Sequence, residues 1–205
     1  MTVHALSIRL AAALVAGALV IGCAGAATDP IETRGHGCPT EQPPPLGAGE
    51  TRTVTIATDL GSIALAIEAD LSPIAAGNFV ALADCGYYDG VVFHRVVPGF
   101  VIQGGDPTGT GGGGPGYTIQ DEPVTTAYAR GTVAMARSRA PNSVGSQFFI
   151  VLDDDARGSL EMANTYQIIG SVSSGMETAD AIAAAADREA PSDPIEMTDV
   201  VVSTP

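Results

Sequence analysis

From residue 53 onward, the chain is divided into short apolar segments that end at glycine or proline. Thr53–Thr58 and Ser62–Glu68 alternate apolar and polar residues on either side of Asp59–Gly61, which predicts a β-hairpin. The other segments expected to form strands are Val91–Val96, Phe100–Gln103, Gly131–Ala136, Gln147–Leu152, Tyr166–Val172 and Ile195–Ser203. Many short strands favour a sandwich or a closed barrel, and a barrel removes the exposed edges.

Two segments have helical rather than strand character. Ser72 and Pro73 provide an N-cap residue and a proline at the first helical position, so a helix is predicted over Ile74–Asp84, ending near Gly86. The alanine-rich stretch Met176–Ala186 predicts a second helix. The domain is therefore expected to be mainly β.

The first residues are typical of an export signal. Leu10–Ile21 is apolar but shorter than the roughly 20 residues that span a membrane, which favours a cleaved signal peptide over residues 1–22. Val20-Ile21-Gly22-Cys23 resembles the lipobox of bacterial lipoproteins, which implies that Cys23 carries a lipid. The alternative is an ordinary secretory signal in which Cys23 has no role. Residues 23–50, rich in proline and glycine, predict a flexible tether, and residues 51–205 one domain.

An exported chain would lie outside the cytoplasm, held at the cell membrane only by its lipid anchor, or secreted if the lipid is absent. Disulfides persist in that setting, so Cys38 and Cys85 could pair, although two cysteines without a spacing signature could equally stay free.

Charge and residue content argue against several functions. The formal charge is −14, and all nine basic residues are arginine, which disfavours nucleic-acid binding. The glycine run 111–114 is not followed by the Lys of a phosphate-binding loop, so it is interpreted as a flexible loop beside a groove. The sequence has no G-x-S-x-G motif and no His or Cys cluster at metal-ligand spacing. We expect neither a metal nor a cofactor.

Two motifs carry a family resemblance. Residues 93–106 read F-H-R-V-V-P-G-F-V-I-Q-G-G-D, and residues 131–150 contain G-T-V-A-M-A, P-N-S and G-S-Q-F-F-I. Both match the signature blocks of cyclophilins, the second in its bacterial form, and the resemblance covers about residues 53–202. It implies a closed eight-stranded antiparallel barrel capped by two helices, with peptidyl-prolyl cis-trans isomerase activity (EC 5.2.1.8).

The chemistry of that reaction fits the residue types. Rotating an X-Pro bond must overcome a barrier of about 18–20 kcal/mol that arises from amide resonance. Binding the twisted amide more tightly than the planar isomers lowers this barrier without covalent or acid–base steps. A guanidinium that hydrogen-bonds the pyramidal prolyl nitrogen does this, a role the resemblance gives to Arg95, with Gln103 alongside.

The resemblance also implies the substrate-binding residues. They are Phe100, Val101, Ala136, Arg137, Gln147, Phe149, Leu160 and Tyr166. Leu160 is chosen over Met162 in a segment, residues 153–165, that is longer than in compact members. Tyr166 stands where eukaryotic members have a histidine, and the chain has no Trp, so strong cyclosporin binding is not expected. Phe79, Phe93, Phe148 and Met135 are expected in the core.

We expect a monomeric isomerase that acts on X-Pro bonds of exported or envelope proteins and assists their folding. One alternative is a binding module that holds Pro-containing segments without turnover. Another is a structural envelope protein that binds no peptide.

Overall fold

The computed structural model describes residues 1–2, 37–163 and 165–204. Within the unit spanning residues 34–205, eight strands form one sheet in the order β3-β4-β6-β5-β7-β2-β1-β8, and every strand pair is antiparallel. The strands are β1 Thr51–Thr58, β2 Gly61–Glu68, β3 Arg95–Val97, β4 Val101–Gly104, β5 Thr132–Met135, β6 Phe148–Val151, β7 Ile168–Ser174 and β8 Asp199–Ser203. The prediction of a mainly β fold is confirmed. The predicted signal peptide and Cys23 lie outside the described residues.

The predicted hairpin is formed by β1 and β2. Val54 pairs with Leu65 and Ile56 with Ile63, and these four side chains are fully buried, whereas their neighbours along each strand are more exposed. One face of the hairpin therefore contributes to the core, as its alternating sequence predicts.

The sheet is open, so the prediction of a closed barrel is not confirmed. Strands β3 and β8 lie at its two edges. The segments that precede these strands meet at the isolated bridge between Val92 and Glu196. At the edge of β3, the Val96 N–H donates to the Glu189 carbonyl at 2.8 Å and not to a neighbouring strand. A loop therefore occupies the edge of β3 where closure would need a strand.

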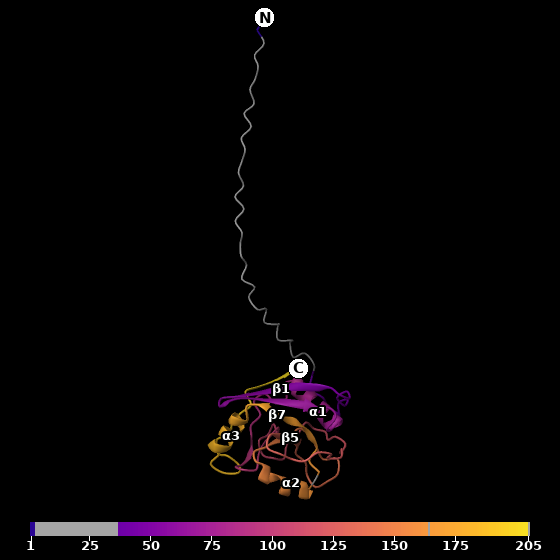
Figure 1. Ribbon diagram of the computed structural model, residues 1–205, viewed down its shortest axis with the longest axis vertical. Helices are drawn as coiled ribbons and strands as arrows, with labels where there is room; N and C mark the ends of the chain where they lie inside the picture. Colours follow the sequence, from indigo (N-terminus) through magenta and orange to yellow (C-terminus); the bar gives the residue numbers. More distant parts are fainter. Residues whose placement is uncertain (3–36, 164, 205) are drawn as a thin grey trace. The chain divides into compact units, whose positions relative to one another are not determined.

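Three α-helices occur in the described part of the chain, one more than predicted. They are α1 Pro73–Asp84, α2 Arg157–Ala163 and α3 Met176–Ala185, with a 3-10 turn, η1 Asp154–Ala156, before α2. Figure 1 shows α2 at the opposite end of this unit from β1. The helix α2 was not predicted because its seven residues are too few for an apolar period to be evident. None of the described helices is long and apolar enough to span a membrane.

The N-terminus of α1 is held by a distant carboxylate. The Ser72 side chain makes no capping hydrogen bond, although Pro73 opens the helix as predicted. The two Glu122 carboxylate oxygens accept from the Ile74 and Ala75 N–H groups, each at 2.9 Å. A carboxylate in this position satisfies free N–H groups and complements the helix dipole.

The strands separate two apolar clusters on opposite faces of the sheet. Ile102, Val133 and Ile150 belong to the main core, together with Phe79, Phe93, Met135 and Phe148, all fully buried as predicted. Val101 and Phe149, on the alternate positions of β4 and β6, belong to a second cluster. Leu160 of α2 and Tyr128 also belong to this second cluster. The helix α2 therefore packs on the face of the sheet that carries Val101 and Phe149.

Residues 37–50, predicted as part of the flexible tether, pack on the domain. The Leu46 N–H donates to the Pro73 carbonyl at 3.0 Å, and a disulfide joins Cys38 to Cys85 at the end of α1. Gly77 of α1 permits this contact, because a Cβ there would lie 2.8 Å from the Leu46 nitrogen. The disulfide and a close backbone contact thus fix this segment to α1.

Removing the disulfide is expected to lower the free energy of unfolding. Cys38 and Cys85 are 47 residues apart in sequence, so the cross-link restricts a long loop in the unfolded chain. We expect the Cys38→Ser, Cys85→Ser double variant to lose about 2–4 kcal/mol. Urea unfolding followed by circular dichroism measures the loss. Reductant should shift the wild-type midpoint and leave the variant unchanged. Equal midpoints for oxidised wild type and variant would contradict the expectation.

Candidate functional site

The strand register brings three predicted site residues into one row. Arg95 of β3 is paired with Gln103 of β4, and Gln103 is paired with Phe149 of β6. Directly paired residues in an antiparallel sheet project their side chains from the same face. Val101 precedes Gln103 by two positions, and its side chain therefore also lies on this face.

Nine of the ten residues predicted for catalysis and substrate binding line one pocket of about 110 Å³. They are Arg95, Phe100, Val101, Gln103, Ala136, Arg137, Phe149, Leu160 and Tyr166. Leu160 is 3% exposed, whereas Met162 is 85% exposed, so α2 turns Leu160 toward the pocket. The pocket joins apolar walls to two cations, Arg95 and Arg137, and to the Gln103 amide.

Aromatic contacts fix one wall of the pocket. The rings of Phe149 and Tyr166 meet edge to face, with centroids 5.4 Å apart. The Tyr128 hydroxyl donates to the Tyr166 carbonyl at 2.8 Å, and the Tyr128 side chain is fully buried. Edge-to-face rings attract each other beyond the effect of area burial. Phe149 is thus held in place by a neighbour that also lines the pocket.

Arg95 is held from two sides. Its Nη1 lies 3.5 Å from Gln103 Oε1, and its Nε donates to Glu189 Oε1 at 2.7 Å. Glu189 was not predicted as part of the site. It follows Arg95 by 94 residues, and no motif marks it.

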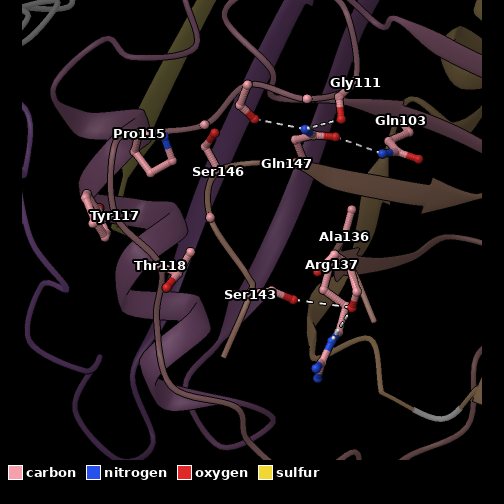
Figure 2. Close-up of a pocket in the computed structure, with 15 residues that line it drawn as sticks. Gln103, Gly111, Pro115, Tyr117, Thr118, Ala136, Arg137, Ser143, Ser146 and Gln147 are labelled. Carbon is pink, nitrogen blue, oxygen red and sulfur yellow. Dashed lines mark hydrogen bonds between the residues drawn. The ribbon is translucent and has the colours of Figure 1, made fainter. Parts of the chain in front are cut away.

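Gln147, the tenth predicted residue, lines a neighbouring cavity of about 410 Å³ (Figure 2). Gln103 Nε2 donates to Gln147 Oε1 at 3.0 Å. Gln147 Nε2 donates to the carbonyls of Gly111 and Gly113, at 3.0 and 2.9 Å. Figure 2 shows the Gln147 amide hydrogen-bonded to both Gln103 and Gly111. The side-chain amides of Gln103 and Gln147 therefore connect Arg95 to the glycine-rich loop. Three residues, Gln103, Ala136 and Arg137, line both cavities.

The glycine-rich loop is organised around Asp106, which is fully buried. The Asp106 carboxylate accepts from the N–H groups of Thr108, Thr110, Gly111 and Gly113, at 2.6 to 3.1 Å, and from the Thr108 hydroxyl. Burial raises the pKa of Asp106, but the hydrogen bonds, that from Gly113 foremost, lower it well below its usual value. The loop lies beside the groove as predicted, with more internal hydrogen bonding than a flexible loop requires.

Arg137 forms part of the wall shared by the two cavities. Its side chain is 9% exposed, and its Nη1 lies 3.0 Å from Asp121 Oδ1. Its Nη2 donates to the Ala140 carbonyl at 2.7 Å. Asp121 and Asn142 exchange two further hydrogen bonds through their side chains and backbone N–H groups. Asp121 was not predicted, because the sequence does not indicate which acidic residue meets Arg137.

His94 is expected to make the free energy of unfolding depend on pH. Its side chain lies beside Gly111, and burial lowers its pKa more than the nearby Asp106 carboxylate raises it. The unfolded chain therefore binds a proton at a higher pH than the folded chain does. We expect the free energy of unfolding to decrease as pH falls from about 7 through the ordinary His pKa of 6.5.

Urea unfolding at several pH values tests this expectation. The His94→Gln variant should show a smaller decrease in stability between pH 7 and 5 than wild type does. An identical slope in the two proteins would assign the pH dependence to other groups.

In the described part of the chain, no group of three or more His, Cys, Asp or Glu side chains is placed to hold a metal ion. The pocket offers two guanidinium groups, those of Arg95 and Arg137, one amide and an apolar surface. Such a site can bind an apolar ring and donate hydrogen bonds to a neighbouring atom that becomes more basic during a reaction.

Residues 53–202 match a family model described as cyclophilin type peptidyl-prolyl cis-trans isomerase/CLD. Among curated proteins, the chain is similar to peptidyl-prolyl cis-trans isomerase CYP18-1 of Arabidopsis thaliana, with 44% identity over 133 residues, covering 62% of this chain and 80% of the relative. It also matches a putative bifunctional phosphatase/peptidyl-prolyl cis-trans isomerase of Streptococcus pyogenes, with 50% identity over 102 residues, covering 48% of this chain and 22% of that protein.

The chain is also similar to solved structures described as cyclophilin type peptidyl-prolyl cis-trans isomerases. A cyclophilin type peptidyl-prolyl cis-trans isomerase of Cryptosporidium parvum superposes with a TM-score of 0.68 at 35% identity, over 76% of this chain and 99% of that one. The structure of the same protein in the presence of the dipeptide Ala-Pro gives 0.67 at 36% identity, over 75% and 99% of the two chains.

Proposed function

The chain belongs to the cyclophilin-type peptidyl-prolyl cis-trans isomerases, and we propose that the pocket at Arg95 binds the proline of X-Pro segments in exported proteins and catalyses their isomerisation. The observation that carries this proposal is the row formed by Arg95, Gln103 and Phe149 across three paired strands. This row sets a cation and an apolar surface side by side in one pocket.

In the proposed mechanism, Phe100, Val101, Phe149 and Leu160 hold the proline ring while the preceding carbonyl rotates. As the bond twists, the prolyl nitrogen loses its resonance with the carbonyl and becomes a hydrogen-bond acceptor. Arg95 then donates to that nitrogen, an interaction that neither planar isomer offers, so the twisted state is bound more tightly than the planar states. Gln103 orients the guanidinium through Nη1. No bond is made or broken.

A steady-state assay separates this proposal from a binding module. An X-Pro peptide whose trans form is selectively cleaved by a protease reports the rate of cis-to-trans conversion, and fluorescence anisotropy of a labelled Pro-containing peptide reports binding. We expect catalytic amounts of the chain to accelerate conversion. Binding without acceleration would favour the module.

We further propose that the domain is exported and held at the membrane by a lipid on Cys23. The sequence Val20-Ile21-Gly22-Cys23 supports this proposal, as does the Cys38–Cys85 disulfide, because disulfides persist in oxidising compartments. Mass spectrometry of the mature N-terminus in the source cell tests it. A lipid-modified Cys23 in the membrane fraction is expected. An unprocessed Met1 in the soluble cytoplasmic fraction would contradict it.

A further inference from the structure

We infer that Glu189 is a positioning residue for Arg95, an inference that rests on the proposed role of Arg95 in catalysis. Glu189 Oε1 accepts from Arg95 Nε at 2.7 Å, whereas the Arg95–Gln103 contact is much longer, at 3.5 Å. The shortest contact of the proposed catalytic side chain is thus made to Glu189, in the loop that follows α3. Charge-assisted hydrogen bonds of this length are among the stronger ones in proteins.

Both the backbone and the side chain of Glu189 bind to β3. The Glu189 carbonyl accepts from the Val96 N–H at 2.8 Å, so the residue is held next to Arg95 at the edge of the sheet. Two more hydrogen bonds brace the loop, because Ser192 donates to Asp187 through its N–H at 2.9 Å and its hydroxyl at 2.7 Å. The Glu189 side chain therefore starts from a fixed backbone rather than from a free loop.

The position of Glu189 also determines which Arg95 donors remain for a substrate. A guanidinium is a rigid, planar fork, so two anchored points fix its plane. Glu189 binds Nε, and Gln103 approaches Nη1. Within residues 37–163 and 165–204, Arg95 uses only these two nitrogens in hydrogen bonds, which leaves Nη2 available. A catalytic donor held in this way loses little further freedom when the substrate binds.

The exposure of the pair argues for a role in positioning rather than in stability. The side chains of Arg95 and Glu189 are 37% and 63% exposed. Ion pairs at such exposure contribute little to folding, because water screens them. Side-chain variants of Glu189 also keep the carbonyl that binds Val96, so the loop should stay in place.

Three variants test the inference in the protease-coupled assay. Glu189→Gln keeps an oxygen that can accept from Arg95 Nε, Glu189→Ala removes it, and Glu50→Ala removes a matched exposed ion pair to Arg52, at 2.9 Å, far from the pocket in sequence. We expect Glu189→Ala to lower kcat about 10-fold and to leave KM within about twofold, because the apolar contacts to the proline ring are kept. Glu189→Gln and Glu50→Ala should stay within about twofold of wild type in both constants.

A spectroscopic measurement complements the kinetics. The 15Nε–1H resonance of Arg95 should shift and exchange faster with water in Glu189→Ala, and should stay close to wild type in Glu189→Gln. Thermal unfolding midpoints should agree among all four proteins, which would exclude a folding defect.

Wild-type kcat in Glu189→Ala would overturn the inference. So would a loss in Glu189→Gln as large as that in Glu189→Ala, because charge rather than the hydrogen bond would then be responsible. Arg95→Ala distinguishes this failure from failure of the proposed function. If Arg95→Ala is inactive while Glu189→Ala is fully active, only the positioning role is wrong.

Discussion

Replacing Arg95 by alanine is expected to lower kcat/KM for an X-Pro peptide by about 100- to 1,000-fold, the usual cost of removing one preorganised donor to a transition state. Arg95 is the cation paired with Gln103 across β3 and β4, and the substrate ring would still bind to Phe149 and its neighbours. The loss should therefore appear mainly in kcat. The protease-coupled assay measures both constants.

Two further variants sharpen the Arg95 prediction. Arg95→Lys keeps the charge but not the planar fork, so it should remain close to Arg95→Ala in activity. Arg52→Ala removes an arginine of β1 that pairs with Glu50, and should behave as wild type. Activity of Arg95→Ala within a few fold of wild type would show that the guanidinium does not stabilise the twisted amide.

Replacing Asp106 by alanine is expected to lower the free energy of unfolding by about 3 kcal/mol, because several charge-assisted hydrogen bonds are lost together. Asp106 is fully buried and accepts from four backbone N–H groups of the glycine-rich loop. The cavity that contains Gln147 should also open, since Gln147 binds the carbonyls of Gly111 and Gly113 in this loop. Urea unfolding measures the stability, and the amide exchange rate of Gly113 measures the opening.

Asp70 provides the control, because it is exposed and accepts one N–H, from Gly49 at 2.8 Å. Asp70→Ala should change stability far less than Asp106→Ala does.

The contribution of Asp106 to stability should depend on pH with a definite sign. Because the folded pKa of Asp106 is lowered, its contribution is complete above the ordinary carboxyl pKa of 3.8 and is lost as pH falls below it. Equal stability of wild type and Asp106→Ala at neutral pH would contradict the prediction.

Strand periodicity accounts for only part of the pocket, because four of its nine residues, Arg95, Val101, Gln103 and Phe149, lie in β3, β4 and β6. The position of Val101 two residues before Gln103 places both side chains on one face. The five pocket residues outside the strands were predicted from the family resemblance alone; they are Phe100, Ala136, Arg137, Leu160 and Tyr166. The core residues Phe79 and Phe148 followed from their apolar character and their place outside the predicted pocket. These inferences needed only local periodicity and a family pattern.

The remaining features depend on contacts between distant segments. Glu189 reaches Arg95 across 94 residues, and Arg137 meets Asp121 through an irregular segment without a motif. The open edge of the sheet has the same origin, since the Glu189 loop rather than a strand binds Val96. Local patterns contain no information on which loop will reach an edge, so an open sheet could not be told from a closed barrel.

The most direct test follows the cis and trans proline signals of an Ala-Pro peptide by two-dimensional NMR exchange spectroscopy at equilibrium. Uncatalysed exchange takes tens to hundreds of seconds, too slow to give cross-peaks in such a spectrum. Catalytic amounts of wild-type chain should produce exchange cross-peaks without changing the cis-to-trans ratio, and Arg95→Ala should not produce them. Cross-peaks of equal intensity with Arg95→Ala, or none with wild type despite peptide binding, would contradict catalysis by this pocket.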